Sequence, residues 1–178
     1  MTDYIIRPAT EEDLEVLLRY AEALFSERLP GIFRRPVPRR EEELEFIRSH
    51  TTRPNSVLLL AVAGGEFVGV AGFLSETLPE RAHAGEFGIS VAHNWRGRGI
   101  GTALLETLFT WASDHGIRRI EGEAFVTNPR ALELYRRLGF VEEGRLVGAV
   151  IRDGVPIDLI AIVKTLEPRD RSGDSWDF

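Results

Sequence analysis

The stretch from Arg96 to Thr102 reads Arg-Gly-Arg-Gly-Ile-Gly-Thr, and it decides how the rest of the chain is interpreted. It lies between an apolar, strand-like run at 86–91 and an amphipathic, helix-like run at 103–112. Glycines let backbone N–H groups crowd around an anion, and the first turn of a helix adds unpaired donors and the positive end of its dipole. The pattern favours a phosphate-binding turn, with Arg96 and Arg98 supplying charge, over a solvated basic turn that only connects two elements.

Length and composition bound the class of protein. The chain has 178 residues, 43% of them hydrophobic, which is typical of one globular domain. It has no cysteine, and its four histidines show no ligand spacing, so we expect neither a disulfide framework nor a metal site. A net charge of −6 argues against a nucleic-acid partner. Without a signal-like start or a long apolar run, we expect a cytoplasmic protein and no membrane span.

Before the turn, the pattern predicts a strand, two helices and a hairpin. Thr10 stands three residues before Asp13, as in the capping box of a helix start. Apolar residues follow at helical spacing from Leu14 to Phe25, and Pro30-Gly31 is predicted to end this helix. The other expected elements are a strand at 4–7, a connector at 33–40, a helix at 41–50, and a hairpin of strands at 56–62 and 66–74.

After the turn, the pattern predicts a strand at 117–125, a helix at 129–138 that Gly139 ends, and a hairpin around Arg152-Asp153-Gly154. Two hairpins around a central strand-turn-helix indicate a mixed sheet with helices on its faces, which is a layered α/β (mixed α+β) domain. We expect the domain to span 1–166 and the polar segment 167–178 to be a flexible tail.

A dinucleotide-binding fold is the usual competitor for a glycine-rich turn. Glu121 lies about 20 residues downstream, where a ribose-binding acid is expected. The glycine spacing fits poorly, because Gly97, Gly99 and Gly101 alternate and Thr102 occupies the last slot of the fingerprint. A Walker-type loop is excluded because the sequence contains neither Gly-Lys-Ser nor Gly-Lys-Thr.

Two segments resemble the signature regions of the GNAT superfamily of acetyl-CoA-dependent N-acetyltransferases. VAHNWRGRGIGTALL (91–105) is similar to its Arg/Gln-x-x-Gly-x-Gly/Ala loop at Arg96, Gly99 and Gly101. NPRALELYRRLGF (128–140) is similar to its Asn-to-Tyr helix ending in Gly-Phe. The resemblance extends over residues 4–166 and implies a mixed, mostly antiparallel sheet of about six to seven strands flanked by about four helices.

The resemblance also implies how acetyl-CoA is bound. The pyrophosphate would lie on backbone amides of the glycine-rich turn, and the pantetheine arm would pair with the preceding strand and contact Asn128. The implied cofactor-binding residues are Ile89, Val91, Arg96, Arg98, Gly99, Ile100, Gly101, Thr102 and Asn128. Asn128 before Pro129 is equally an ordinary N-cap, and no metal is implied.

Acetyl transfer to an amine requires a neutral nucleophile and a stabilised leaving thiolate. The resemblance assigns Tyr135 to the thiolate, although Leu132, Tyr135 and Leu138 share a helical face, so that simple core packing is the alternative. Glu86 is the candidate base, directly or through water, with a solvent-facing strand glutamate as the alternative. His83 is a weaker substitute for Glu86.

The resemblance places the acceptor cleft between residues 29–40 and 147–158. Arg34, Arg35, Arg39 and Arg40 in the first segment are candidates for pairing with a carboxylate, or they form a solvated surface. We therefore expect direct attack on acetyl-CoA, in a ternary complex, by a primary amine of a small molecule such as an amino acid. The alternatives are protein N-terminal or polyamine acetylation and a noncatalytic acyl-CoA-sensing module. For the oligomeric state, a homodimer is one of the alternatives.

Overall fold

The computed structural model describes residues 4–167, which form seven strands in one sheet. The strand order is β1-β2-β3-β4-β5-β7-β6, and only the pairing of β4 with β5 is parallel. The layered, mostly antiparallel α/β fold is therefore confirmed. The strands are β1 (Ile5–Pro8), β2 (Val57–Ala63), β3 (Glu66–Ser75), β4 (Ala84–Val91), β5 (Arg119–Phe125), β6 (Val141–Arg152) and β7 (Val155–Thr165).

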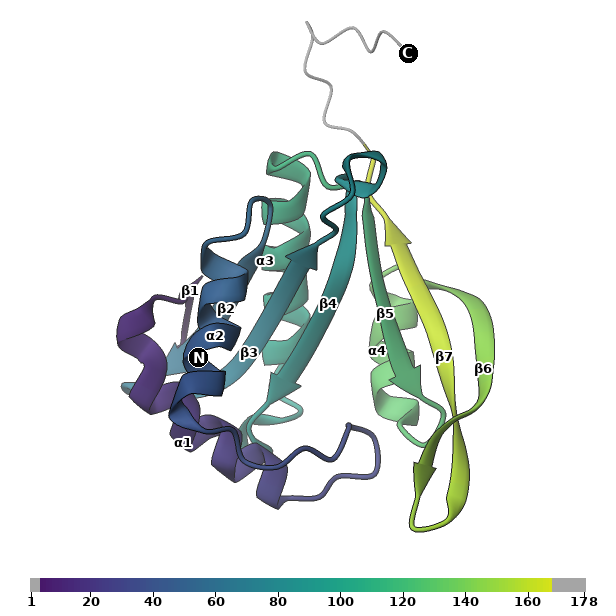
Figure 1. Cartoon of the computed structure of the whole chain (residues 1–178), viewed down its shortest axis with the longest axis horizontal. Coiled ribbons are helices and arrows are strands. Elements are labelled where there is room, and N and C mark those ends of the chain that lie inside the picture. Colours follow the sequence, from purple (N-terminus) through teal and green to yellow (C-terminus); the bar gives the residue numbers. More distant parts are fainter. Residues whose placement is uncertain (1–3, 168–178) are drawn as a thin grey trace, which may run out of the picture.

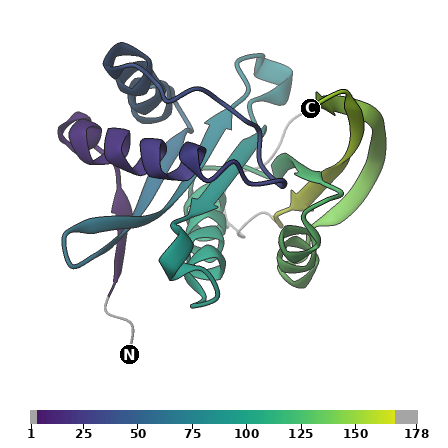
Figure 2. The same cartoon turned by 90° about the horizontal axis from the view of Figure 1, so that it is seen from below.

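Four α-helices cover the two faces of the sheet (Figures 1 and 2). Helices α1 (Leu14–Ser26) and α2 (Arg40–Thr51) lie on one face, and α3 (Ile100–Asp114) and α4 (Pro129–Arg137) lie on the other. Short 3-10 turns occur at Glu11–Asp13, Pro79–Arg81 and His93–Trp95. No helix within residues 4–167 is long and apolar enough to cross a membrane.

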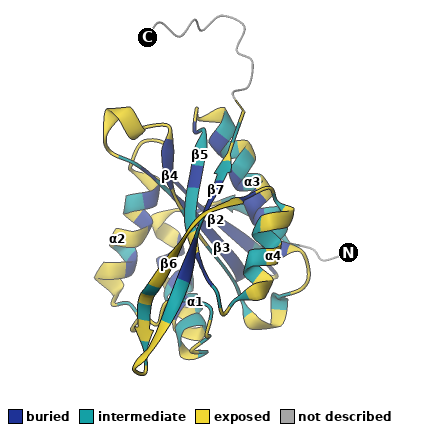
Figure 3. Ribbon diagram, turned by 90° about the vertical axis from the view of Figure 1, so that its right-hand side faces the viewer, coloured by how far each residue is buried: buried dark blue, intermediate teal, exposed yellow. Residues whose placement is uncertain are grey.

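Each face of the sheet has its own apolar core. The larger core joins α3 to the sheet through fully buried residues such as Phe73, Leu104, Leu108 and Ile120. The smaller core joins α1 and α2 to β2 and β3. Strands β2 and β3 are buried along most of their length, whereas β6 at the sheet end is largely exposed (Figure 3). The central strands therefore form a rigid floor on which the other elements are fixed.

The start of the first long helix is held by the predicted capping interaction. The backbone N–H of Thr10 donates to Asp13 Oδ2 over 2.8 Å, and Arg7 makes two further bonds to the same carboxylate. These contacts lower the pKa of Asp13, mainly through the hydrogen bond from Arg7. The capping box spans a 3-10 turn, because Thr10 precedes the turn and Asp13 is its last residue, and α1 itself begins at Leu14.

The predicted end of this helix at Pro30-Gly31 is wrong, because α1 ends at Ser26. The hydroxyl of Ser26 donates back to the carbonyls of Glu22 and Ala23, and Arg28 adopts a left-handed conformation with φ of 48°. A left-handed residue cannot continue a right-handed helix. Residues 27–39 therefore form a long loop over the edge of the sheet, which we call the acceptor loop.

Strands β4 and β5 diverge where the functional site lies (Figure 1). Their pairing comprises Ala84 with Arg119, Gly85 with Ile120 and Glu86 with Glu121, and it ends there. Beyond Glu86, β4 remains paired with β3 as far as Val91. One edge of β4 is thus without a neighbouring strand from residue 87 onward.

Candidate active site

A cleft of about 1040 Å³ opens where β4 and β5 separate. Both faces of the sheet contribute to its walls. Residues of α3, α4 and the glycine-rich turn form one side, and residues of the acceptor loop, α1 and α2 form the other. The cleft is therefore open toward both faces of the sheet, and the free edge of β4 runs between its two sides.

The glycine-rich turn, residues 96–102, leads directly into α3 at the cleft. Gly97 and Gly99 have φ of 80° and 83°, conformations that favour glycine. Ala103 is the first residue of the helix whose N–H is paired, with the carbonyl of Gly99. Within the described residues, no acceptor is found for the amides of residues 97–102, and most of these residues line the cleft. The turn therefore offers a set of free donors at a helix N-terminus, as the sequence predicted for a phosphate.

Arg96 lines the cleft, and its guanidinium is occupied by partners within the protein. Its guanidinium makes two bonds to Glu27, of 2.7 and 2.8 Å, and its Nε donates to the carbonyl of Val91. The two side chains of this ion pair are only 24% and 20% exposed. Arg96 thus joins the end of β4 to the first residue of the acceptor loop, and its contact with phosphate stays a prediction.

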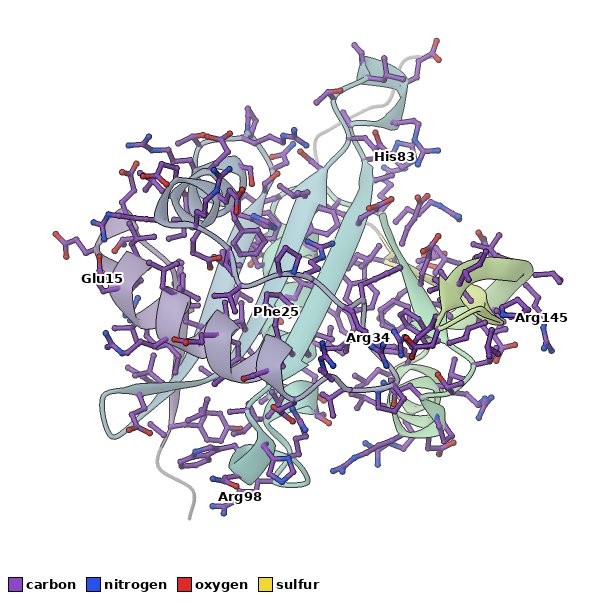
Figure 4. The ribbon with its side chains drawn as sticks, turned by 60° about the horizontal axis from the view of Figure 1, so that its bottom comes forward. Glu15, Phe25, Arg34, His83, Arg98 and Arg145 are labelled. Atoms are coloured by element: carbon purple, nitrogen blue, oxygen red, sulfur yellow. The ribbon has the colours of Figure 1, made fainter. Side chains whose placement is uncertain are left out.

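The two other nearby arginines differ in where they point. The Arg98 guanidinium stacks over Trp95 at 4.9 Å, and Figure 4 shows Arg98 at the outer edge of the molecule. Arg130 on α4, by contrast, lines the cleft, and its Nη2 lies 3.1 Å from where a Cβ of Gly97 would be. The sequence offered Arg130, together with Arg136 and Arg137, as a candidate contact for an outer phosphate, but we did not select it because an arginine on a helix is usually solvated. The distance of Arg130 to the turn is visible only in the folded chain.

Main-chain groups of Ile89 and Val91 point to the free edge of β4. Along a strand, N–H and C=O groups of successive residues point to opposite edges. The carbonyl of His83 accepts from Arg118 and Arg119 at the start of β5, whereas Ala84 pairs with the residue after β3. Ile89 and Val91 each follow His83 by an even number of positions, so their N–H and C=O groups point to the same edge of β4 as the carbonyl of His83. At Ile89 and Val91 this edge is free, because β5 has diverged from β4. The geometry fits an extended chain laid along this edge, as predicted for pantetheine.

Asn128 acts as the N-cap of α4, and it also lines the cleft. Its Oδ1 accepts from the N–H of Ala131 over 3.1 Å, and its Nδ2 donates to the carbonyl of Gly31 over 3.3 Å. A Cβ on Gly31 would lie 2.5 Å from Asn128, so only glycine allows this approach. The amide of Asn128 is therefore used to hold the acceptor loop, and a direct contact with the cofactor stays a prediction.

Tyr135 packs in the larger core and also reaches the cleft, and its catalytic role stays a prediction. Its ring packs edge-on against Phe87 and Phe140, with centroid distances of 5.4 and 5.5 Å. It also lines the cleft, and within the described chain its hydroxyl has no hydrogen-bond partner and is not sealed from solvent. Burial raises the pKa of Tyr135 to about 12. The hydroxyl thus stays protonated at neutral pH and can donate into the cleft.

Two carboxylates face the cleft from the diverging strands. Glu86 is the third residue of β4 rather than its first, and Glu123 on β5 is a second acid that the sequence analysis missed. No ion pair or hydrogen bond of either carboxylate is found in the described residues, whereas nearby Glu121 is bound by Arg81 and Arg119. His83 does not line the cleft and lies at the end of the sheet opposite Arg98 (Figure 4).

The acceptor loop is held against the hairpin of β6 and β7. The sequence analysis predicted the acceptor cleft between these same two segments. Arg152 donates to the carbonyls of Pro30 and Ile32, and Arg34 pairs with Asp153 at the hairpin turn. Arg39 and Arg40 pair with Glu42 and Glu15 and do not line the cleft. Of the four arginines predicted there, Arg35 is the one that lines the cleft, and no partner for it is found within residues 4–167.

Comparisons with known proteins agree with this geometry. The model of the acetyltransferase (GNAT) family matches residues 19–140. The chain is 30% identical over 154 residues to the L-amino acid N-acetyltransferase AaaT of Escherichia coli (strain K12), which covers 81% of this chain and 94% of that protein. Among solved structures, a ribosomal-protein-alanine N-acetyltransferase from Brucella melitensis is 29% identical with a TM-score of 0.81, covering 91% of this chain and 99% of that one.

A third comparison bears on the cofactor. A GNAT superfamily phosphinothricin acetyltransferase from Sinorhizobium meliloti, solved in complex with AcCoA, has a TM-score of 0.81 and 22% identity, with 96% and 95% of the two chains covered. The shared fold and the free amides of the glycine-rich turn fit the same donor in this chain. No cluster of three or more potential metal ligands is found among residues 4–167.

A substitution at Gly101 tests the turn as the diphosphate site. A Cβ there meets its nearest neighbour, Leu134, at an ordinary 3.5 Å, so the backbone tolerates a side chain. We expect Gly101→Glu to weaken CoA binding by at least about 100-fold, because a carboxylate then competes for the free amides. Gly101→Ala is the matched control and changes the Kd little. Calorimetric titration measures both, and an unchanged Kd in Gly101→Glu removes the turn from the site.

Proposed function

Because the chain belongs to the acetyltransferase (GNAT) family, and is thus an N-acetyltransferase that uses acetyl-CoA, we propose that its acceptor is a small amino acid or a close analogue. The observation that supports this most directly is the composition of the acceptor side of the cleft. This side of the cleft is lined by two carboxylates, Glu86 and Glu123, and one guanidinium, Arg35, for which no partner is found within residues 4–167. This set of charges complements an ammonium and a carboxylate in one molecule.

Different parts of the fold bind the acetyl donor and the amine acceptor. Acetyl-CoA supplies the activated acetyl group as a thioester. The amides of residues 97–102 and the guanidinium of Arg130 are the donors for its phosphates, and the free edge of β4 at Ile89 and Val91 pairs with its arm. Each charge-assisted hydrogen bond to phosphate contributes about 1.5–3 kcal/mol, so several suffice for micromolar binding.

We assign the general base to Glu86. A lysine-like ammonium costs about 4–5 kcal/mol to deprotonate at pH 7, so a proton acceptor near the nucleophile is needed. Glu86 takes one proton from the ammonium, directly or through water, and the neutral nitrogen attacks the carbonyl carbon in the ternary complex. The C–N bond forms, the C–S bond breaks, and the nitrogen loses its second proton.

Tyr135 is the proton donor to the departing sulfur. Its hydroxyl is free and protonated, because burial keeps its pKa near 12. It gives its proton to the thiolate and regains one from the nitrogen or from solvent, so that the products are the amide, the free thiol of CoA and one proton. The edge-on packing against Phe87 and Phe140 fixes the ring while leaving the hydroxyl accessible.

The names of two of the three related proteins point to acceptors of the same kind, and the third is named for a protein acceptor. The Escherichia coli relative is named for L-amino acids and the Sinorhizobium meliloti structure for phosphinothricin, while the Brucella melitensis structure is named for the alanine of a ribosomal protein. A protein N-terminus and a polyamine both lack the free carboxylate that Arg35 fits. They remain the alternatives, together with a noncatalytic acyl-CoA sensor.

A homodimer and a cytoplasmic location are part of the same proposal. Strand β6 lies at the end of the sheet, and Val147 and Ile151 on it are 82% and 75% exposed, which favours contact with a second copy of the chain. Sedimentation analysis that finds only monomer contradicts the dimer. Cell fractionation checks the location, which we propose because acetyl-CoA must be supplied to the enzyme.

A panel of amines tests the proposed acceptor. With acetyl-CoA present, we expect free thiol to be released with L-amino acids and much more slowly with their decarboxylated amines, a polyamine or an alanine-initiated peptide. We expect Arg35→Ala to raise the KM for the amino acid about 10-fold or more, because a charge-assisted bond is lost. Arg39→Ala, which removes an arginine outside the cleft, is the control.

Each other outcome of this panel has a distinct meaning. Binding of acetyl-CoA without thiol release from any amine indicates the sensor. A preference for the peptide or the polyamine, or an amino acid KM that Arg35→Ala leaves unchanged, contradicts the proposed acceptor.

The role of Tyr135 is tested by removing its hydroxyl alone. Tyr135→Phe keeps the ring that packs on Phe87 and Phe140, so we expect normal folding and normal acetyl-CoA affinity. The kcat is expected to fall about 100-fold or more, since a positioned proton donor is lost. With a pKa near 12, Tyr135 remains protonated up to that pH, so the wild-type kcat is expected not to fall between pH 8 and 10 through its ionisation. Unchanged turnover in Tyr135→Phe returns the residue to a packing role.

The two carboxylates are distinguished by single amide substitutions. We expect Glu86→Gln to lower kcat/KM about 100-fold or more and to remove the acidic limb of the pH profile, because the base is then absent. Glu123→Gln is expected to have the smaller effect and to keep that limb. If the two variants show the reverse order, the base is Glu123 and the assignment to Glu86 is wrong.

A further inference from the structure

An unfilled space lies on the acceptor side of the sheet above Gly88. A Cβ added to Gly88 would meet no heavy atom within 4 Å. Gly88 pairs across the strands with Gly72, so two facing residues without side chains form the floor of this space. Along β4, side chains alternate between faces, and Glu86 therefore lies on the same face as Gly88. The cleft includes all three residues.

His50 at the end of α2 borders this space. It is 5% exposed, and its Nδ1 lies 2.8 Å from the carbonyl of Phe46. A carbonyl only accepts hydrogen bonds, so Nδ1 carries the proton and, in a neutral ring, Nε2 presents a lone pair. Burial lowers the pKa of His50 below its usual value, with Arg53 acting in the same direction and the Phe46 carbonyl opposing it. The imidazole is therefore neutral at pH 7.

The free nitrogen of His50 is directed at the glycine floor. Nε2 lies 2.7 Å from where a Cβ of Gly72 would be, so only glycine at this position lets the ring come so close to the sheet. Among the described residues Nε2 has no hydrogen-bond partner, and it is not sealed from solvent. His50 also lines the cleft. A buried, neutral acceptor thus faces the site with its lone pair unused.

From this arrangement we propose that His50 is a second hydrogen-bond acceptor for the reacting amine, which lies over Gly88 between His50 and Glu86. The proposal rests on the acetyltransferase function given above. Gly72 and Glu86 are diagonal neighbours across the strands, which places the two residues about 7–8 Å apart and their Cβ positions slightly closer, enough for one nitrogen between two acceptors. A neutral primary amine has two N–H groups and one lone pair. With one N–H given to each acceptor, the lone pair is left to point toward the edge of β4, where the thioester is bound.

The arrangement also specifies the class of acceptor. A secondary amine has only one N–H once it is neutral, so it leaves either His50 or Glu86 without a donor. The site is therefore selective for primary amines over their N-methyl counterparts. An unpaired acceptor in a desolvated site is costly, so the preference is expected to be about 10-fold or more in kcat/KM.

His115 provides a matched control for the local structure. Its Nδ1 lies 2.7 Å from the carbonyl of Trp111, four residues earlier, and its ring stacks on Trp111. His50 makes the same bond to the carbonyl of Phe46, and its ring is tilted against that of Phe46, with centroids 4.5 Å apart. The bond from a histidine to the carbonyl four residues back is thus a recurrent feature of helix ends in this chain. Of these two histidines, only His50 lines the cleft.

The experiment compares His50→Phe, His50→Gln, Gly88→Val and His115→Phe with wild type. For each, kcat/KM is measured with a primary amine acceptor and its N-methyl analogue, and the acetyl-CoA Kd is measured by calorimetry. We expect His50→Phe to lower kcat/KM for the primary amine about 10-fold or more and to reduce the preference over the N-methyl amine. His50→Gln restores much of the rate, because its amide oxygen can accept in place of Nε2. Gly88→Val fills the space and suppresses acetyl transfer, and all variants keep the wild-type Kd.

Three results overturn the proposal. They are wild-type behaviour of His50→Phe, loss of acetyl-CoA affinity in parallel with activity in His50→Phe, and an unchanged preference between primary and N-methyl amines in that variant. If wild type itself binds no acetyl-CoA or acetylates no amine, the proposed function fails first, and this is seen before any variant is tested. An effect of His115→Phe equal to that of His50→Phe likewise assigns the loss to helix structure.

Discussion

The divergence of β4 from β5 after Glu86 is the constraint on which the rest of the site depends. Polar backbone groups in a protein interior need partners, and a strand edge that loses its neighbour offers its N–H and C=O groups to another extended chain. The same divergence opens the cleft between the two faces of the sheet. Because side chains alternate along β4, one strand presents Ile89 and Val91 to the α3 and α4 side and Glu86 and Gly88 to the other side. Donor and acceptor are thereby brought together from opposite faces.

The sequence suggests several arginines as ligands for a phosphate or a carboxylate, yet in the structure some of these arginines hold the walls of the cleft in place. Arg96 ties the glycine-rich turn and the end of β4 to Glu27, where the acceptor loop begins. Arg152 and Arg34 tie the same loop to the terminal hairpin. A bidentate arginine has fixed geometry, so these contacts position both binding regions relative to each other. The cofactor side and the acceptor side are therefore mechanically joined through the acceptor loop.

Apolar burial and polar function are combined in the same residues at the centre of the site. The ring of Tyr135 belongs to the larger core, while its hydroxyl remains open to the cleft. His50 is buried at the end of α2, yet its Nε2 has no partner within the part of the chain that the structure describes. Burial raises the pKa of the tyrosine and lowers that of the histidine, and both effects favour the neutral form. The site thus holds a neutral donor on one side and a neutral acceptor on the other.

The sequence by itself determined most of the elements, the class of fold and the glycine-rich turn, because spacing, capping and glycine conformation depend on near neighbours in the chain. The role of Tyr135 came from the family resemblance and stays a prediction. Glu123 and His50 were not found in this way, and Arg130 was considered but not selected, since each is an ordinary residue within its own helix or strand. The end of α1 was also misplaced, because Pro30-Gly31 suggested a later stop, whereas the helix ends at Ser26 and Glu27 pairs with Arg96, 69 residues away. Only the tertiary structure decided which side chains face the cleft, because that depends on strand pairing and on contacts between segments far apart in the chain.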